Sequence, residues 1–509
     1  MKRIAAVGLA LLLLLTGCAP AGIPSHTPTG DGLTWDDATT PPQTQGQEQA
    51  LEMVYYPDRS MNPLESRDYT NRALFSLIYQ GLFAVDADYN PVPILCQRYT
   101  VTGDMRSYTF YIANASFSDG TPLTPQDVYD SLDAAMDSPV YGGRFLHVNR
   151  MTLEEDGGIT LRMDTPFENL PMLLDVPILK SGETDAEAPL GTGPYFLEQT
   201  NAGARLRRRT NWWCNANLEI TASSIPLQAA QSAVQIRDAF EFSSVGLVCA
   251  NPCSDDYADY RSDYELWDCE NGGFLFLAAN TDGPVFSNSA LRSALTYAID
   301  REAIAAEYYR GYARAAALPA SPQSPFYNAA LAGRYAYNPQ KFSQAVEDAE
   351  LPEDTPVRLL ANKEDTLRLR VARRIQQMLQ DCGMVVEFRE CSQKDYFKAL
   401  KNGDYDLYLG QTRLSANMDL STFFSSRGNI TYGGMTDPVI YALCLESLAN
   451  RGNFYNLHAA IAEDGRLVSI LFQSYAVYAT RGLVSGLTPS RDNVFFYTLG
   501  RTMEDALAE

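Results

Sequence analysis

The stretch from residue 356 to 410 constrains the fold most, because strand and helix signals alternate along it. Three short apolar runs have the length of buried strands, at 357–361, 384–388 and 405–409. The stretch between the first two runs repeats apolar residues at helical spacing, at Leu367, Val371, Ile375, Met378 and Leu379. Gly383 ends this helix, and Ser392 caps a second helix that stops at Gly403. This order predicts an α/β fold with a mostly parallel sheet under helical cover.

The N-terminal half of the chain shows the same mixture of strand and helix signals. Residues 51–56 and 108–112 have strand patterns, and 72–79 has the pattern of a short helix. A further helix is expected after Thr124, which caps it, with proline at the first helical position and Asp127 completing a capping box. The sequence contains no tandem repeat of fixed period. The whole body of the chain is therefore expected to mix strands and helices.

The first residues have the pattern of an export signal. Lys2 and Arg3 precede an apolar run over 4–15, which is too short to span a bilayer that needs roughly 20 residues. The pattern is typical of a cleaved signal peptide covering 1–17. Its Leu-x-Gly-Cys ending resembles the bacterial lipobox, in which the cysteine is diacylated and becomes the first residue. We therefore expect Cys18 to carry a lipid that anchors the protein outside the cytoplasm to the cell membrane; the alternative is an ordinary signal peptide that happens to end at a cysteine.

The residues after this cysteine, 18–50, have the composition of a flexible tether. Proline, threonine, glycine and glutamine are frequent, and apolar residues show no periodicity. Such a segment buries too little surface to offset its ordering entropy. The body that follows has about 460 residues, enough for two or three domains with large cores.

The charge and the cysteines of the chain exclude some functions. A formal net charge of −22 disfavours a nucleic-acid partner, because an acidic surface repels a phosphate backbone. Eight cysteines follow Cys18, and their spacing defines no connectivity, so buried thiols and a few disulfides both remain open. Cys249 and Cys253 lack a second pair and a neighbouring histidine. Neither a metal site nor a cofactor is therefore expected.

Short motifs follow one another along the body in a distinctive order. They are MNPL at 61–64, IYQGLF at 78–83, PVP at 91–93, YTF at 108–110, FSDGTPLT at 117–124, GTGPY at 191–195, NWW at 211–213, FLAAN at 276–280, LRSAL at 291–295, AID at 298–300 and YDL at 405–407. Each motif alone is a common turn or helix end. Their order is similar to that of the extracellular solute-binding proteins of family 5, the oligopeptide, dipeptide and nickel receptors of ABC importers. The resemblance covers nearly the whole body of the chain.

The resemblance implies a two-lobed, periplasmic-binding-protein-like fold of the large class, with a hinge about which the lobes close over a solute. Lobe I would combine three segments, 51–65, 190–282 and 482–509. A subdomain inserted into lobe I would cover 66–189, and lobe II would cover 283–481. The implied function is capture of a peptide, whose backbone pairs with strand edges, and its delivery to ABC permease subunits in the membrane. We expect the protein to act as a monomer.

The resemblance also implies an acidic ligand residue after the YDL strand. In peptide receptors of the family this carboxylate pairs with the peptide's α-amino group, a charge-assisted bond that strengthens in a closed cleft. Asp419 is the only acid between Asp406 and Asp437, so the role falls to it. The alternative is that Asp419 caps a helix over 420–424. The tryptophan that the family carries in this segment is absent, and Gln411 stands near its place.

Four further residues are candidate ligand contacts by the same resemblance. Asn417 lies in the segment expected to pair with the peptide backbone, and Arg413 is a candidate for binding a carboxylate. Asn62 and Tyr69 lie in or near an early loop that faces the ligand in the family. Each has a structural alternative: an exposed arginine beside a strand, a turn residue for Asn62, and a core aromatic for Tyr69.

Other functions have less support from the sequence. The chain has no His-Glu-x-x-His, no Gly-x-Ser-x-Gly and no phosphate loop, so we expect no enzyme. A secreted hydrolase that uses two carboxylates is the least favoured alternative. Among binding functions, an oligosaccharide, a metal chelate and a signalling role remain open. Nickel is disfavoured because neither His147 nor His458 lies in a recognised ligand segment.

Overall fold

A computed structural model of the protein describes residues 51–508, apart from 202, 215, 217, 255, 353, 354 and 485. The expected signal peptide, the lipidated Cys18 and the tether lie outside the described residues. Within the described part, no helix has the length and the apolarity needed to cross a membrane. The eight cysteines of this part are all free thiols, so no disulfide joins two described residues.

One sheet of eleven strands runs through the molecule. Its strand order is β15 (Val386–Cys391), β14 (Val357–Asn362), β16 (Leu407–Arg413), β12 (Tyr264–Ala279), β17 (Leu467–Thr480), β11 (Leu247–Ala250), β1 (Met53–Tyr55), β10 (Ser224–Ala229), β9 (Gly203–Arg208) and β8 (Tyr195–Thr200), and β13 (Ala313–Ala315) also pairs with β17. β14 is parallel to β15 and β16, and β1 is parallel to β10 and β11. The remaining pairs are antiparallel. Four of the ten described strand pairs of this sheet are parallel, so the expectation of a mostly parallel sheet holds only locally, around β14 in lobe II and around β1 in lobe I. The long strands β12 and β17 pair antiparallel and make the sheet mixed.

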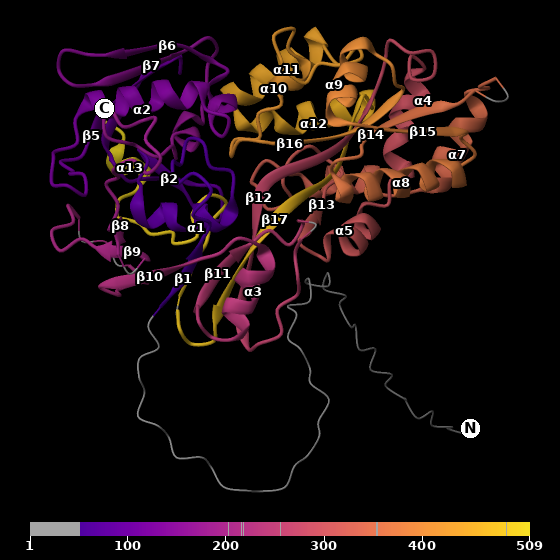
Figure 1. Ribbon diagram of the computed structural model, residues 1–509. Helices are drawn as coiled ribbons and strands as arrows, with labels where there is room; N and C mark the ends of the chain where they lie inside the picture. The colour runs from indigo at the N-terminus through magenta and orange to yellow at the C-terminus, as the bar shows by residue number, and fades with distance from the viewer. Residues whose placement is uncertain are drawn as a thin grey trace, which may run out of the picture. The chain divides into compact units, whose positions relative to one another are not determined.

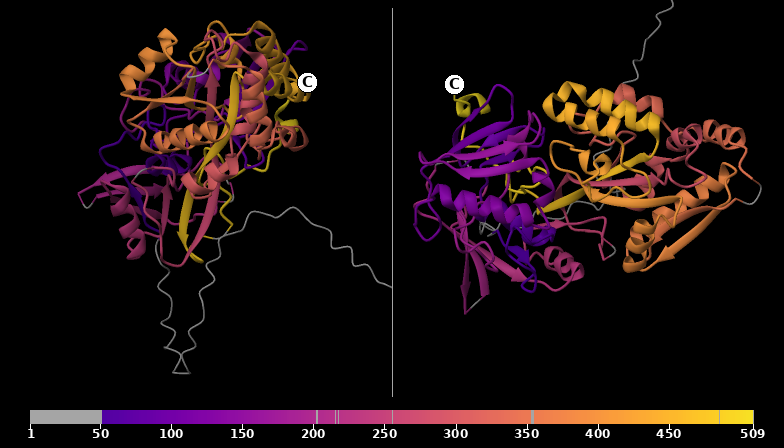
Figure 2. Two further views of the ribbon diagram at one scale, coloured as in Figure 1. Left: turned by 90° about the vertical axis from the view of Figure 1, so that its right-hand side faces the viewer. Right: turned by 90° about the horizontal axis from the view of Figure 1, so that it is seen from above.

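Two long strands, β12 and β17, connect the two parts of this sheet. They pair antiparallel along most of their length, with a register shift between Glu270 and Phe274 where Gly272 has a φ of +78°. A Cβ at Gly272 would meet the guanidinium group of Arg491, and its positive φ is one that residues other than glycine rarely adopt, so both features favour glycine here. Both ribbon views show the two strands running between the lobes (Figures 1 and 2). They form the connection at which a hinge is expected.

Lobe I contains a second sheet and four short or medium helices. The helices are α1 (Tyr69–Ile78), α2 (Pro125–Asp137), α3 (Ala233–Glu241) and α13 (Met503–Ala506); the second sheet has the order β4 (Cys96–Val101), β5 (Ser107–Ile112), β7 (Ile159–Met163), β6 (Val148–Leu153), and β2 (Phe83–Val85) pairs with β3 (Pro91–Pro93). α2 begins after Thr124 with the expected capping box. One hydrophobic cluster includes Phe110 of the second sheet and Leu206 of the long sheet. The residues of the expected inserted subdomain, 66–189, therefore share a core with the rest of lobe I.

Lobe II has helices on both faces of the long sheet. Its elements include α4 (Ser289–Ala294), α5 (Arg301–Tyr309), α6 (Ala329–Ala332), α7 (Pro339–Asp348), α8 (Thr366–Asp381), α9 (Gln393–Asn402), α10 (Ser421–Phe424), α11 (Pro438–Ala449) and α12 (Phe454–Asp464). Leu275 of β12 packs with α5, α7 and α8, whereas the next side chain along the strand, Phe276, packs with α9 to α12. This is the alternation that a strand imposes. The predicted order of strand, helix, strand, helix, strand is confirmed by β14, α8, β15, α9 and β16.

Candidate ligand-binding cleft

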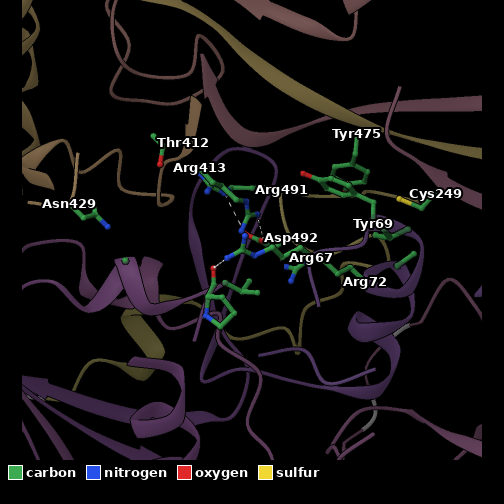
Figure 3. Close-up of a pocket in the computed structure, with 15 residues that line it drawn as sticks. Arg67, Tyr69, Arg72, Cys249, Thr412, Arg413, Asn429, Tyr475, Arg491 and Asp492 are labelled. Atoms are coloured by element: carbon green, nitrogen blue, oxygen red, sulfur yellow. Dashed lines mark hydrogen bonds and ion pairs between the residues drawn. The ribbon is translucent and has the colours of Figure 1, made fainter. Parts of the chain in front are cut away.

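Two adjoining cavities lie where lobe I meets lobe II. Their volumes are about 420 Å³ and about 230 Å³. Both are lined by Val140 and Gly143 of lobe I, by Thr412 and Arg413 at the end of β16 in lobe II, and by Arg491 from the segment after β17. Because the two cavities share these walls, they form a single cleft between the lobes, whose larger part is drawn in Figure 3.

Five arginines line this cleft, although the chain as a whole has a net charge of −22. They come from five separate places: Arg67 just before α1, Arg72 within α1, Arg144 in the 3-10 helix Gly142–Phe145, Arg413 at the end of β16, and Arg491 after β17. Among the residues that the structure describes, one carboxylate lines each cavity, Asp492 in the larger and Asp419 in the smaller. The walls of the cleft are therefore strongly cationic.

Asp492 lies at the centre of the arginine cluster. Its carboxylate is 2.5 Å from Arg413, 3.3 Å from Arg72, 3.4 Å from Arg491 and 3.5 Å from Arg144, and its side chain is 7% exposed. Burial opposes its ionisation, but the guanidinium groups outweigh burial and hold the pKa of Asp492 well below its usual value. Figure 3 shows the labelled arginines gathered round this residue. One carboxylate thus forms ion pairs with arginines from both lobes.

Arg491 keeps unused hydrogen-bonding capacity. Its Nη2 donates to the carbonyl oxygen of Leu414, and its Nε lies 3.4 Å from Oδ2 of Asp492. Its Nη1 has no hydrogen-bond partner among the described residues. Burial and the neighbouring Arg413 lower the pKa of Arg491 to about 10. Arg491 lines both cavities, and a guanidinium at a cavity wall is suited to bind a carboxylate or another oxyanion.

His147 bridges the two lobes at the smaller cavity. Its Nδ1 lies 3.1 Å from Asp164 of lobe I, and its Nε2 lies 2.8 Å from the Ser421 hydroxyl and 3.3 Å from the Asp419 carboxylate of lobe II. Burial alone would lower the pKa of His147, but the bonds and charges of Asp419 and Asp164 outweigh it, and the pKa is raised. The bridge therefore favours an imidazolium held between two carboxylates.

The sequence relationships agree with this architecture. The model of the bacterial extracellular solute-binding proteins, family 5 Middle, matches residues 90–431. The chain belongs to this family. The glutathione-binding protein GsiB of Salmonella typhimurium is 22% identical over 353 residues, which are 64% of this chain and 66% of that protein. The match thus spans just under two thirds of the length of this relative.

Solved structures show the same two-lobed fold as this family 5 protein. HbpA2 of Haemophilus parasuis has a TM-score of 0.74 at 18% identity, over 88% of this chain and 98% of that chain. The oligopeptide-binding protein AppA of Bacillus subtilis, solved with a nonapeptide, has a TM-score of 0.61 at 17% identity, over 89% and 98%. The fold predicted from the sequence is therefore confirmed.

Three of the five candidate ligand residues line the cleft of this family 5 protein. Arg413 lines both cavities, and its Nε donates to the carbonyl oxygen of Asn271 at 2.8 Å. Tyr69 lines the larger cavity and stacks on Tyr475 with ring centroids 5.8 Å apart. Asp419 lines the smaller cavity and also accepts the N–H of Ser421, the first residue of α10. The N-cap residue of α10 is Leu420, without a side-chain capping bond, so Asp419 is not the helix cap that the sequence offered as an alternative; its ligand contact stays a prediction.

The other two candidates, Asn62 and Asn417, lie outside the walls of these two cavities. The Asn62 amide donates to two backbone carbonyls, those of Thr184 at 2.7 Å and Ala186 at 2.9 Å, and its Oδ1 accepts the N–H of Leu64. Asn417 is 1% exposed and accepts the hydroxyl of Ser415 at 2.6 Å. Both amides support loop structure beside the cleft.

Most charged residues of the cleft were missed from the sequence: Arg67, Arg72, Arg144, Arg491 and Asp492. They stand alone in loops or on helices, and no spacing relates them. The Arg491-Asp492 pair follows the last strand in a segment with no periodicity. Only the folding of distant segments onto one another brings these residues together, so a single sequence holds no local signal for the site.

Proposed function

We propose that this family 5 protein is the lipid-anchored substrate-binding protein of an ABC importer, and that it captures short peptides by their carboxylate end. The observation that carries the proposal is the arginine cluster of the cleft, with the unused Nη1 of Arg491. Arginine presents paired N–H donors that match the two oxygens of a carboxylate. The larger cavity, about 420 Å³, is within the range of roughly 300–1,000 Å³ typical of small-ligand sites.

The cleft suggests an orientation for the peptide. The carboxylate would lie against Arg413 and Arg491 in the larger cavity. The α-amino group would extend into the smaller cavity, where Asp419 is the one lining acid. The segment around Ser415 would supply backbone hydrogen bonds between these two ends. Asp419 would then exchange part of its pairing with His147 for the ligand's ammonium group.

The ligands of similar proteins support a solute that carries a carboxylate group. GsiB is named for glutathione, AppA of Bacillus subtilis was solved with a nonapeptide, AgaA of A. tumefaciens with agropinic acid, and NikA of Brucella suis with Fe(III)-EDTA. All of these ligands carry carboxylate groups. A neutral sugar is less suited, because the larger cavity offers one tyrosine pair, Tyr69 on Tyr475, against four arginines.

The direct test compares blocked and free peptides. We expect Ala-Ala-Ala to bind the full-length chain carrying Cys18→Ser in calorimetry, and its C-terminal amide to bind at least about tenfold more weakly, a factor equal to 1.4 kcal/mol. N-acetylation should weaken binding less in Asp419→Asn than in the unmodified chain, because the partner of the ammonium group is already gone. If neither the free nor the blocked tripeptides bind, the peptide assignment is wrong.

The lipid anchor has a separate test. Cells that express the protein and grow with labelled palmitate should label it, and Cys18→Ala should abolish the label while export continues. Labelling of the variant to the same extent would contradict lipidation at this cysteine.

A further inference from the structure

The charges that line the cleft do not cancel. Five arginines face two carboxylates, Asp492 and Asp419. An excess of three positive charges therefore borders two small cavities. Charges held close together and partly out of water repel one another strongly, because water screens them less there than in bulk.

The groups behind the walls reduce this excess only in part. Asp175 pairs with Arg144, Glu270 lies beside Arg491, and His147 adds a positive charge when protonated. With both of these carboxyls ionised and His147 protonated, two positive charges remain. Burial raises the pKa of Asp175 and of Glu270, and each proton that they take up adds one to the excess. Asp164, on the other side of His147, is 44% exposed, and Arg67 is exposed as well, so water screens both charges. Without Arg67 in the count, one positive charge remains.

Two of the arginines keep hydrogen-bonding capacity: Arg67, which is exposed to solvent, and Arg491, whose Nη1 is buried from water. Arg67 donates to the carbonyl oxygen of Pro139 at 2.8 Å and forms no ion pair with a described residue. Arg491 has the unused Nη1. Both line the larger cavity, together with Arg72 and Arg413. A single small ligand in this cavity therefore meets arginines on more than one side.

We propose that the captured solute carries at least two negatively charged groups close together, so that it enters the cleft as a net anion. A C-terminal glutamate meets this requirement, because the carbons of its α-carboxylate and its side-chain carboxylate are four bonds apart. This inference deepens the proposed function and takes the same cleft as the site. A zwitterionic tripeptide has no net charge and leaves the excess of the cleft in place, whereas each added carboxylate removes one positive charge of that excess.

The test is a charge series of one peptide length. Calorimetry on the full-length chain carrying Cys18→Ser would compare Ala-Ala-Lys, Ala-Ala-Ala, Ala-Ala-Glu and Ala-Glu-Glu, with glutarate as a dicarboxylate that is not a peptide. We expect affinity to rise in that peptide order by about tenfold for each carboxylate added. Arg67→Gln should lose more affinity for Ala-Ala-Glu than for Ala-Ala-Ala. Arg373→Gln, an exposed surface arginine paired with Glu390, is the matched control and should lose none.

The outcomes separate this inference from the proposed function. Equal affinity for all four peptides would overturn the inference and leave the peptide receptor intact. Binding of glutarate without any tripeptide would support a doubly anionic solute and overturn the peptide assignment. Weaker binding of Ala-Glu-Glu than of Ala-Ala-Ala would overturn the inference directly, and an equal loss for both peptides in Arg67→Gln would do the same. Thermal melts of each variant check that the fold is kept.

Discussion

Two buried histidines, one at the cleft and one inside lobe II, lie in opposite kinds of surroundings. His147 is 3% exposed and lies between Asp164 of its own lobe and Asp419 of the other lobe. His458 on α12 is fully buried, its ring packs 5.5 Å from that of Phe454, and neither ring nitrogen has a hydrogen-bond partner among the described residues. The carboxylates raise the pKa of His147 against the effect of burial, whereas burial lowers the pKa of His458 to about 3.

This difference shows under which conditions a buried histidine carries a charge. A buried ion persists only if partners replace the water that it loses, and at the lobe boundary both lobes supply such partners. Inside lobe II no partner is present at His458, so the imidazole stays neutral. The boundary is therefore sensitive to anything that alters charge or lobe position, and the interior of lobe II is sensitive to acid. The following experiments test each side of this contrast.

The largest effect is expected from Asp492→Asn. This change removes the carboxylate shared by Arg72, Arg144, Arg413 and Arg491 and leaves buried cations without a counter-ion. We expect a loss of about 3–5 kcal/mol in the free energy of unfolding, measured by urea titration at pH 7.

An exposed ion pair provides the control for this experiment. Asp263 pairs with Arg481 at 2.9 Å, and the two side chains are 74% and 57% exposed. Asp263→Asn should cost less than about 1 kcal/mol, because water screens the pair. Equal losses of unfolding free energy in the two variants would show that the Asp492 cluster is not a buried network of ion pairs. They would also contradict the view that partners at the lobe boundary stabilise buried charge.

The interior of lobe II should respond to acid through His458. Its pKa is lowered from 6.5 to about 3 by burial, so the unfolded chain takes up a proton below pH 6.5 that the folded protein does not. The contribution to stability is therefore present above pH 6.5 and is lost as the pH falls toward 3, by about 3 kcal/mol at pH 4. His458→Leu should abolish this part of the pH dependence in urea titrations from pH 4 to 8. The same slope in both proteins would contradict a neutral buried imidazole.

The sequence could predict the features that depend on neighbouring residues, and it could not predict those that depend on distant ones. The order β14, α8, β15, α9 and β16 was predicted because each helix and strand shows its own periodicity and caps, such as Ser392 before α9. The crossing of β12 and β17 was not predicted, since it depends on pairing between segments about 200 residues apart. The spacing of apolar residues shows which face of a single helix or strand is buried. It does not show which distant strand will pair with it, as β12 and β17 do between the lobes.

The site was harder to predict than the fold for a related reason. Arg413, Tyr69 and Asp419 were found because a family motif order points to their segments. The other arginines of the cleft have no motif, and the role of Arg72, Arg144 and Arg491 arises from proximity to Asp492 in the folded chain. A positive charge in a loop gives no sign of whether it faces water or a shared carboxylate.

The smallest effect is expected at the bridge, with a pH dependence opposite to that of His458. The pKa of His147 is raised in the folded protein, so its contribution is complete below pH 6.5, where both states hold the proton, and is lost as the pH rises through the raised value. His147→Gln keeps a donor for Ser421 and removes the charge between Asp164 and Asp419. We expect it to cost about 1.5–2 kcal/mol at pH 5.5 and less at pH 8, because hydrogen bonds to charged groups contribute roughly 1.5–3 kcal/mol. In the double variant with His458→Leu the two pH effects should add, since the sites share no partner.

A cost that stays the same at both pH values would mean that the bridge holds a neutral histidine, and the two buried histidines would then differ in their partners but not in their charge.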